Sequence, residues 1–323
     1  MKIAVLGCGH ISSKMARTLR MMKENGEDVC LYAAAARDLK KAEAFAAREG
    51  FEKAYGSYED MVHDPQVELV YIGTPHSLHF EQMMLCLAHG KHVLCEKAFT
   101  LNAKQAKEAL ALAREKKLIC AEAIWPRYMP SFEIIKGLVD EIGGAQYIAS
   151  DLHYEMESIP RIVQPELAGG GLLDIGVYAI TFARMYMGTP ITRVESCAQL
   201  TDLGVDRQAN ITLFGENGCV AMLSCGIAAN GGQHTMIAGP EGRIVVDNVF
   251  NPHEVRVITG ETERVVSMPP DFTGYEYEVR ACMEAIRNQD AECKAMPHEE
   301  ILYVMELMDS LRAQWGMKYP QEK

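Results

Sequence analysis

The chain has 323 residues, 48% of them hydrophobic and 24% charged, and this length and composition favour two folded domains over one. Its 32 basic and 44 acidic residues give a net charge of −12 without a cluster of Lys or Arg, so nucleic acid is a poor partner. No uninterrupted run of ~18 apolar residues that could span a bilayer is present, which argues against a membrane protein.

The first residues and the cysteines indicate the cellular compartment. Residues 1–6 lead directly into a polar turn and lack the basic start and longer apolar stretch of a secretory signal, so we expect a cytoplasmic protein. The ten cysteines occur singly, mostly inside apolar segments, without a C-x-x-C pair or a histidine at zinc-finger spacing. We therefore expect reduced core thiols and no metal site.

In the first part of the chain, residues 2–121, short apolar runs alternate with segments of helical period. This alternation is typical of parallel strands joined by crossover helices. The predicted strands are 3–6, 29–35, a weak strand at 54–55, 69–72, 92–95 and 118–121. The predicted helices are 11–24, 38–48, 57–63, 77–88 and 103–116. The order predicts a doubly wound α/β domain with a parallel sheet.

The pattern changes after Pro126. The predicted elements are a helix at 131–141, a strand at 145–154, a helix at 170–187, strands at 192–201, 207–214, 219–226, 233–238, 243–248 and 254–258, and helices at 275–288 and 298–314. Sequential strands joined by short Gly-rich turns predict antiparallel pairing in an α+β domain. We therefore divide the chain into a dinucleotide-binding domain, 1–121, and a substrate domain, 122–323, whose C-terminal helix can pack back on the first domain.

A Gly-rich turn follows the first predicted strand. It consists of Gly7, Cys8, Gly9, His10, Ile11 and Ser12, with Ser12 in place of the third glycine of a dinucleotide motif. Glycines permit the tight turn and let backbone N–H groups approach a pyrophosphate at the helix N-terminus. The turn could serve only to reverse the chain. However, the strand and helix that flank it favour a cofactor site formed by Gly7, Gly9, His10 and Ile11.

The end of the second predicted strand indicates which cofactor is bound. An Asp or Glu at this point would accept both ribose hydroxyls of NAD, but here Arg37 follows three alanines. A guanidinium is suited to a 2′-phosphate, and Asp38 is better explained as the N-cap of the next helix. We therefore favour NADP, with NAD as the alternative. Arg37 could instead be a solvated residue at the strand end that contacts no cofactor.

Three further segments combine with this turn: Gly73–His79, Val93–Lys97 and Gly169–Tyr178. Together they resemble the glucose-fructose oxidoreductase / inositol dehydrogenase family, and Glu122–Tyr128 brings the match close to its dimeric dihydrodiol dehydrogenase branch. The resemblance covers essentially the whole chain. It implies an N-terminal Rossmann domain, a C-terminal α+β domain with an open antiparallel sheet, and a catalytic cleft between them.

Lys97 comes just after a buried parallel strand, at the edge where α/β proteins bind ligands. The resemblance implies that it is the catalytic lysine, beside a cofactor-contacting Glu96. The structural alternative is an exposed loop lysine paired with Glu96. Family members usually have proline after this lysine, commonly with a cis bond. Here Ala98 follows instead, so the sequence does not decide between a cis and a trans Lys97–Ala98 peptide bond.

Asp174 and Tyr178 are four residues apart on a predicted helix, so we expect both side chains on one face. A phenol whose pKa is lowered by Lys97 can take the hydroxyl proton during hydride removal, which makes Tyr178 the acid/base candidate. Tyr178 could instead be a core aromatic residue. Asp174 could orient Tyr178, bind a substrate hydroxyl or cap its helix.

Two loops complete the candidate site. Thr74 and Pro75 follow the fourth strand and should lie beside the nicotinamide ribose, where His79 could bind substrate or be structural. Trp125 and Arg127 follow the sixth strand, and the resemblance implies that they flank the cofactor or the substrate. The residues alone, without the resemblance, predict that Arg127 only anchors the loop.

These residues predict an NAD(P)-dependent dehydrogenase that acts on a secondary alcohol of a sugar, cyclic polyol or trans-dihydrodiol. The alternatives are a dinucleotide-sensing regulator without chemistry, and a hydrolase or lyase that uses its cofactor transiently. A regulator would be free to lose Lys97, Asp174 and Tyr178, so the presence of all three favours the enzyme.

The predicted sheet indicates self-association. Along residues 194–201, one face carries Val, Ser, Ala and Leu, the other carries Glu, Cys, Gln and Thr, and neither is strongly charged. Such a sheet tends to bury both faces, so we expect a homodimer or higher oligomer through the C-terminal sheet, with Ala198 in the interface.

Overall fold

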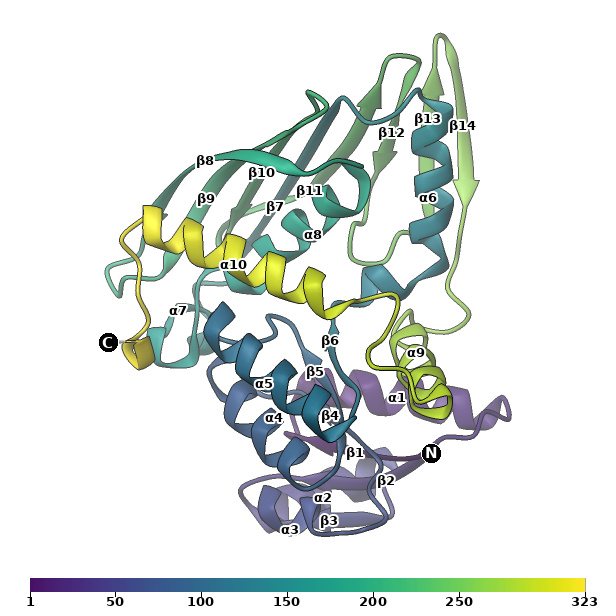
Figure 1. Cartoon of the computed structure of the whole chain (residues 1–323), viewed down its shortest axis with the longest axis vertical. Coiled ribbons are helices and arrows are strands. Elements are labelled where there is room, and N and C mark those ends of the chain that lie inside the picture. Colours follow the sequence, from purple (N-terminus) through teal and green to yellow (C-terminus); the bar gives the residue numbers. More distant parts are fainter. Residues whose placement is uncertain (323) are drawn as a thin grey trace. The chain divides into compact units, whose positions relative to one another are not determined.

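The computed structural model describes residues 1–322, which form two compact units (Figure 1). The first unit comprises Met1–Tyr128 and Asp271–Met305, and the second comprises Met129–Pro270 together with the residues from Glu306 onward. The chain therefore passes between the units after Tyr128, after Pro270 and, inside a helix, after Met305. The residue pattern predicts a single division of the chain, after residue 121, whereas each compact unit is built from two separate segments of the chain.

The first unit contains a six-stranded parallel sheet with the order β3-β2-β1-β4-β5-β6. Its strands are β1 (Lys2–Leu6), β2 (Cys30–Ala35), β3 (Lys53–Tyr55), β4 (Leu69–Ile72), β5 (His92–Glu96) and β6 (Cys120–Ala123). The central strands are buried on both faces, as expected when crossover helices cover both sides of a parallel sheet. The prediction of a doubly wound Rossmann sheet is confirmed.

The helices of the first unit lie close to their predicted positions. They are α1 (His10–Glu24), α2 (Leu39–Glu49), α3 (Tyr58–Val62), α4 (His79–Ala88), α5 (Ala103–Lys116), α9 (Glu276–Asn288), the first part of α10 (His298–Gln314), and the 3₁₀ turns η1 (His76–Leu78) and η2 (Trp125–Tyr128). The last strand starts two residues later than predicted because residues 117 and 118 end α5. Lys117 adopts a left-handed conformation there, and the Leu118 N–H donates to the Ala113 carbonyl.

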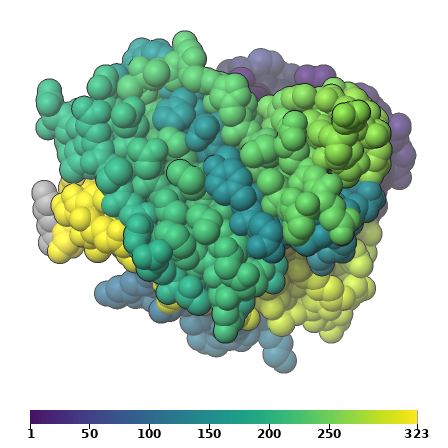
Figure 2. Space-filling view, turned by 90° about the horizontal axis from the view of Figure 1, so that it is seen from above, coloured from purple at the N-terminus to yellow at the C-terminus, as the bar shows by residue number. Residues whose placement is uncertain are grey.

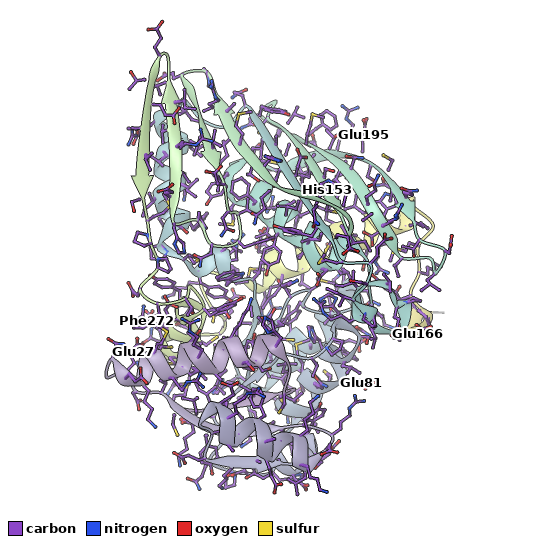
Figure 3. All side chains as sticks on the ribbon, turned by 180° about the vertical axis from the view of Figure 1, so that it is seen from behind. Glu27, Glu81, His153, Glu166, Glu195 and Phe272 are labelled. Atoms are coloured by element: carbon purple, nitrogen blue, oxygen red, sulfur yellow. The ribbon has the colours of Figure 1, made fainter. Side chains whose placement is uncertain are left out.

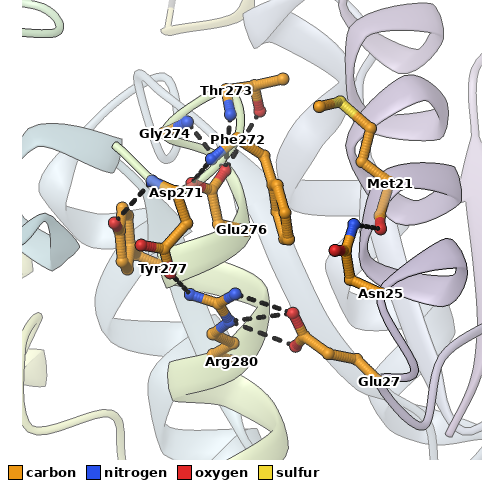
Figure 4. A network of polar contacts seen from close by, with 10 residues as sticks. All are labelled: Met21, Asn25, Glu27, Asp271, Phe272, Thr273, Gly274, Glu276, Tyr277 and Arg280. Carbon is orange, nitrogen blue, oxygen red and sulfur yellow. Dashed lines mark hydrogen bonds and ion pairs between the residues drawn. The ribbon is translucent and has the colours of Figure 1, made fainter. Parts of the chain in front are cut away.

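The segment 271–305 joins the first unit through polar contacts that start at the loop before α9 (Figure 4). The buried Glu276 carboxylate accepts the backbone N–H groups of residues 272, 273 and 274 at 2.7–3.0 Å. Arg280 on α9 pairs with Glu27 at 2.7 Å, just beyond α1. Figure 3 shows Phe272 and Glu27 at the same end of that helix. These contacts explain why the sequence division and the compact units differ.

The second unit contains an eight-stranded sheet with the order β14-β13-β12-β11-β7-β10-β9-β8. Its strands are β7 (Tyr147–Glu155), β8 (Ile191–Leu200), β9 (Asp206–Gly215), β10 (Val220–Gly226), β11 (Ala228–Gly239), β12 (Gly242–Val246), β13 (Glu254–Thr259) and β14 (Thr262–Ser267). Neighbours are antiparallel except for β10 and β7, which are parallel. The predicted open antiparallel sheet is thus confirmed with one exception, since β7 inserts between two strands that follow each other in sequence.

Helices cover the inner face of this sheet. The second unit has α6 (Pro130–Glu141), α7 (Pro160–Val163), a 3₁₀ turn η3 (Pro165–Leu167), a π-helical turn η4 (Leu172–Gly176), α8 (Val177–Tyr186), the last part of α10 and a 3₁₀ turn η5 (Pro320–Glu322). Among the described residues, Pro165–Tyr186 is long and apolar enough to cross a membrane by length and composition. However, its most apolar window is 83% buried, as is usual for a core helix.

Along the edge strand β8, side chains point alternately to the outer and the inner face of the sheet, as in any β-strand. On β8 the side chains of Glu195, Cys197 and Gln199 are exposed. Ala198 instead shares its face with Ser196, which bonds Gln314 and the Trp315 indole just after α10. Ala198 therefore lies on the side of the sheet that α10 approaches, and not among the exposed side chains of β8. Figure 2 looks onto this unit, where green surface lies on both sides of a blue stripe.

Candidate functional site

The turn after β1 forms a cradle at the carboxyl edge of the parallel sheet. Gly7 has a φ of +97°, and a Cβ placed on it would lie 2.7 Å from Thr74 Cγ2. Gly9 is the N-cap of α1, and no side chain of residues 1–322 caps this helix. The N–H groups at its start, from His10 and Ile11 onward, therefore keep their capacity to bind an anion. The cradle fits a dinucleotide pyrophosphate.

Ser12 occupies the position of the motif's third glycine without opening the turn. Its side chain is fully buried, and a Cβ added to Gly73 would lie 2.5 Å from Ser12 Oγ. The missing glycine of α1 is thus compensated by a glycine at the end of β4. This close approach of two loops keeps the cradle intact.

The end of β2 carries exposed positive charge. Asp38 is the N-cap of α2, and its Oδ1 accepts the Lys41 N–H at 2.9 Å, as predicted. Arg37 is exposed at the strand end. Lys41, which the sequence did not single out, interacts electrostatically with Cys8 in the cradle. The cation pair Arg37 and Lys41 can receive a phosphate beside the Gly-rich turn.

The loop after β4 is tied to the loop after β5 by a buried histidine. His79 Nε2 lies 2.9 Å from the Thr74 carbonyl, and its Nδ1 lies 2.9 Å from the Ala98 carbonyl. Burial lowers the pKa of His79, so the ring is neutral and donates to one of the two oxygens. Both ring nitrogens face the protein itself, which favours the structural role for His79. Thr74 Oγ1 donates to Gln82, and Pro75 directly precedes η1.

Lys97 follows β5 and is half-buried. The Lys97–Ala98 peptide bond is cis, the conformation that the sequence left open. Glu96, the last residue of β5, is buried and accepts a hydrogen bond from the Tyr71 hydroxyl at 2.5 Å. The Lys97 N–H donates to the same carboxylate at 3.2 Å. The backbone of Lys97 is therefore tied to a buried, hydrogen-bonded carboxylate at the carboxyl edge of the sheet.

The turn η2 after β6 holds the two residues expected to flank the ligand. The Trp125 ring stacks on Tyr275 at 4.3 Å between centroids, with the ring planes 6° apart. Arg127 pairs with Glu300 at 3.4 Å, and its Nε donates to the Ala295 carbonyl at 3.1 Å. These contacts agree with the loop-anchor explanation for Arg127. Tyr275 is a site neighbour that the sequence did not reveal, because it lies 150 residues away.

In the second unit, the Gly-rich segment leads into the π-helical turn η4. A Cβ on Gly170, whose φ is +115°, would collide with the Asp206 carboxylate, and Asp206 Oδ2 accepts the Leu172 N–H at 2.6 Å. Burial raises the pKa of Asp206 to about 7. The glycines thus let a buried carboxyl group reach the start of the helix. π-helical turns are rare and are often found at functional sites.

Asp174 and Tyr178 lie on this turn and on α8. Asp174 is buried and pairs with Arg161 at 2.8 Å, a residue that the sequence did not single out. The Tyr178 ring contacts Phe250 edge to face at 4.6 Å between centroids, and the Tyr154 ring lies 6.2 Å from that of Phe250. Tyr154 and Phe250 pack against a buried cluster of Ile162, Ile175 and Ile227. Tyr178 is half-buried, so its ring belongs partly to this packing.

All ten cysteines are free thiols, and most are buried, as expected of core residues. Among residues 1–322, no group of three or more His, Cys, Asp or Glu side chains could hold a metal ion.

The comparisons with known proteins agree with this geometry. Residues 1–124 match the oxidoreductase family with an NAD-binding Rossmann fold, and residues 135–245 match the GFO/IDH/MocA C-terminal domain. The chain belongs to the GFO/IDH/MocA oxidoreductase family. As a member of this family, it is an NAD(P)-dependent oxidoreductase, and the enzymatic interpretation is favoured over the regulator.

Within the GFO/IDH/MocA family, the chain is similar over its whole length to trans-1,2-dihydrobenzene-1,2-diol dehydrogenases. The mouse protein is 31% identical, covering 99% of this chain and 98% of its own, and the Xenopus laevis protein is 33% identical, covering 99% of both. A 3-ketoreductase from Actinomadura kijaniata in complex with NADP and TDP-benzene aligns with a TM-score of 0.87 at 26% identity, covering 97% of both chains. A levoglucosan dehydrogenase complexed with NADH shares the fold, with a TM-score of 0.86 at 20% identity and coverage of 98% and 97%.

Proposed function

We propose that this enzyme transfers a hydride between NADP and a secondary alcohol carbon of a sugar, cyclic polyol or trans-dihydrodiol. The observation that carries the proposal is the uncapped start of α1 under Gly7, at the same sheet edge as Lys97. Full-length similarity to dihydrodiol dehydrogenases supports the substrate class.

The proposed division of labour follows from the chemistry of alcohol oxidation. The nicotinamide, when bound, accepts the hydride. The Lys97 ammonium stabilises the negative charge that develops on the substrate oxygen, and the Tyr178 side chain, in its phenolate form, accepts the hydroxyl proton and becomes a neutral phenol. Asp174, held by Arg161, orients this part of the second unit. In this proposal residues 1–121 bind the cofactor, and the second unit supplies the substrate pocket.

A preference for NADP is the finer part of the proposal. Asp38 is used as the cap of α2, so its carboxylate is not the ribose-binding acid that favours NAD. Arg37 at the end of β2 and Lys41 on α2 offer positive charge to a 2′-phosphate instead. We also propose that the enzyme is a homodimer or a higher oligomer that pairs through the outer face of the second unit's sheet.

The decisive experiment follows absorbance at 340 nm with NADP or NAD and a panel of aldoses, cyclic polyols and trans-dihydrodiols. We expect net cofactor reduction with at least one of these classes. Cofactor binding without any net absorbance change, in either reaction direction, would refute the dehydrogenase. That outcome would favour the regulator, or a hydrolase or lyase with transient cofactor use.

A further inference from the structure

Three glutamate side chains from three different elements are buried near one another in the first unit. Glu96 at the end of β5 is 6% exposed, Glu122 on β6 is 2% exposed, and Glu278 on α9 is fully buried. The carboxyl group of Glu96 interacts electrostatically with both of the others. Ionising three carboxyl groups together in one buried region costs much free energy, because the charges lose their hydration and repel one another.

The three carboxyl groups differ in their hydrogen bonds. Glu96 accepts from the Tyr71 hydroxyl at 2.5 Å and from the Lys97 N–H at 3.2 Å. Among the described contacts, the Glu122 carboxyl group accepts one hydrogen bond, from the Phe99 N–H at 3.0 Å. Neither carboxyl oxygen of Glu278 has a hydrogen-bond partner within residues 1–322. Glu96 is therefore the group best equipped to carry a negative charge.

The positive charges nearby are too few for three carboxylates. The cations that act on Glu122 are Lys97 and Arg127, and Arg127 already pairs with Glu300. The other titratable groups that face this region favour protonation or are neutral. They are Cys95 on β5, His79 on α4, Tyr71 on β4, Tyr128 on η2 and Tyr275 next to the start of α9. Glu276 on α9 also faces this region, where it raises the pKa of Glu278, and its own carboxylate accepts three backbone N–H groups. Among Glu96, Glu122 and Glu278, the hydrogen bonds favour Glu96 as the ionised group.

Glu122 and Glu278 are consequently protonated in the free protein at neutral pH. Burial, with repulsion from Glu96, raises the pKa of Glu122 to about 8 and that of Glu278 well above its usual range. Glu122 is the more easily ionised of the two because Lys97 and Arg127 both favour its charged form. It is also tied to the lysine segment, since Phe99 follows Lys97 by two residues.

We propose that Glu122 is a proton-linked charge partner of the oxidised nicotinamide ring: it is neutral in the free enzyme and loses its proton to solvent when the positively charged ring is bound. The inference rests on the proposed cofactor function, which brings a permanent cation to the Lys97 edge of the sheet. The reduced ring is uncharged and leaves Glu122 protonated. Glu122 acts through space and through the Phe99 N–H, so it is a positioning residue.

The sign of the pH effect follows from the direction of proton movement. Because binding of the oxidised cofactor releases a proton, its affinity rises with pH up to about pH 8, where Glu122 is already ionised in the free enzyme. The slope approaches tenfold in Kd per pH unit below that point. The affinity of the reduced cofactor lacks this contribution, so raising the pH favours the oxidised form.

The test is isothermal titration calorimetry of the full-length enzyme with NADP⁺ and with NADPH. Titrations at pH 7 in phosphate and in Tris, whose ionisation enthalpies differ, give the number of protons released. The phosphates are the same in both cofactors, so their contribution cancels in the difference. We expect a difference of ~0.5–0.9 protons between the oxidised and reduced forms.

Two matched variants assign this proton. Glu122→Gln keeps an acceptor for the Phe99 N–H but cannot ionise, and should reduce the difference to near zero. Glu278→Gln removes a carboxyl group that stays protonated in both states and should leave the difference unchanged. An unchanged difference in Glu122→Gln, or its loss in Glu278→Gln alone, would overturn the proposal.

The wild-type enzyme also gives a test that does not depend on how the variants fold. If the Kd values of NADP⁺ and NADPH have the same pH dependence between pH 6 and 9, the inference is wrong. If neither cofactor form, nor NAD⁺ or NADH, binds at all, the proposed function fails instead. The two failures are therefore distinguishable.

Discussion

At the scale of single residues, the segment that carries Lys97 is held from two sides by buried groups. His79 contacts the Ala98 carbonyl, and Glu122 accepts the Phe99 N–H, so the backbone on the C-terminal side of the lysine has fixed partners. A charged group on a fixed backbone needs little reorganisation when charge develops on a substrate oxygen. This arrangement is what a catalytic lysine requires.

We expect Lys97→Met and Tyr178→Phe each to lower turnover by ~100-fold or more, because in the proposed mechanism each removes a group that acts on the reacting oxygen. Cofactor Kd, measured by calorimetry, should stay within a few fold. Phenylalanine retains the ring contact with Phe250, so the second variant isolates the hydroxyl. Lys104→Met, at an exposed position on α5, is the control and should keep wild-type turnover.

Replacing Arg37 by Ala should weaken NADP binding by ~10-fold or more and change NAD binding little, because only NADP presents a 2′-phosphate to the guanidinium. Dissociation constants for the two cofactors, measured side by side, check this. Lys40→Ala, an exposed neighbour on α2, should affect neither cofactor strongly. Equal losses for NADP and NAD in Arg37→Ala would show that Arg37 does not select the cofactor.

At the scale of elements, the residue patterns predict the parallel sheet of the first unit almost completely. Its strands are short, buried and separated by amphipathic helices, which is the clearest local signal a sequence can carry. β14 is missed because nearly all of its side chains are exposed, so it has no apolar face. The π-helical turn is missed because the carboxyl group that organises it, Asp206, comes 34 residues after Leu172.

The same turn gives a prediction for stability. Gly170→Ala should destabilise the protein by ~3 kcal/mol or more, since it combines a disfavoured φ with a collision against Asp206. Gly188→Ala also has a positive φ, of +63°, but meets open space, and should cost only ~1 kcal/mol. Urea unfolding of both variants measures the difference. Similar losses would mean that the contact with Asp206 is unimportant.

At the scale of the whole molecule, the outer face of the second unit's sheet is large and carries few charges at its centre. Across the sheet, Thr212, Met222, Ala149 and Met236 pair in one continuous row. Met222 is 52% exposed at the middle of this row. Figure 3 labels Glu195 on β8 and His153 on β7, the edge and central strands of the same sheet. A second copy can cover this face by two-fold symmetry.

We therefore expect a mass of at least a dimer by light scattering at micromolar concentration, with more than ~1,200 Å² buried in total. Met222→Arg should shift the enzyme towards monomer, because it places an unpaired charge in the contact. Leu203→Arg, at an exposed apolar residue in the turn before β9, should leave the assembly unchanged. A monomeric wild-type enzyme with full activity would contradict the proposed dimer.

The candidate site could be predicted only where its residues lie within recognisable motifs. The Gly-rich turn, Arg37, Lys97 and Tyr178 are such residues. Tyr275, Arg161 and Phe250 could not be found, because each meets its partner through a fold contact rather than through sequence spacing. The side of the sheet on which Ala198 lies could not be assigned for a similar reason, since alternation along a strand separates two faces without indicating which one a distant helix covers.

The return of residues 271–305 to the first unit has a consequence for synthesis on the ribosome. Domains usually fold in the order in which they are made. Here Trp125 lacks its stacking partner until Tyr275 has emerged, and Glu27 lacks Arg280 until α9 is complete. The nascent Rossmann unit therefore lacks these contacts of residues 271–305 until the entire eight-stranded sheet has been translated. The nucleotide-binding part starts first and is finished nearly last.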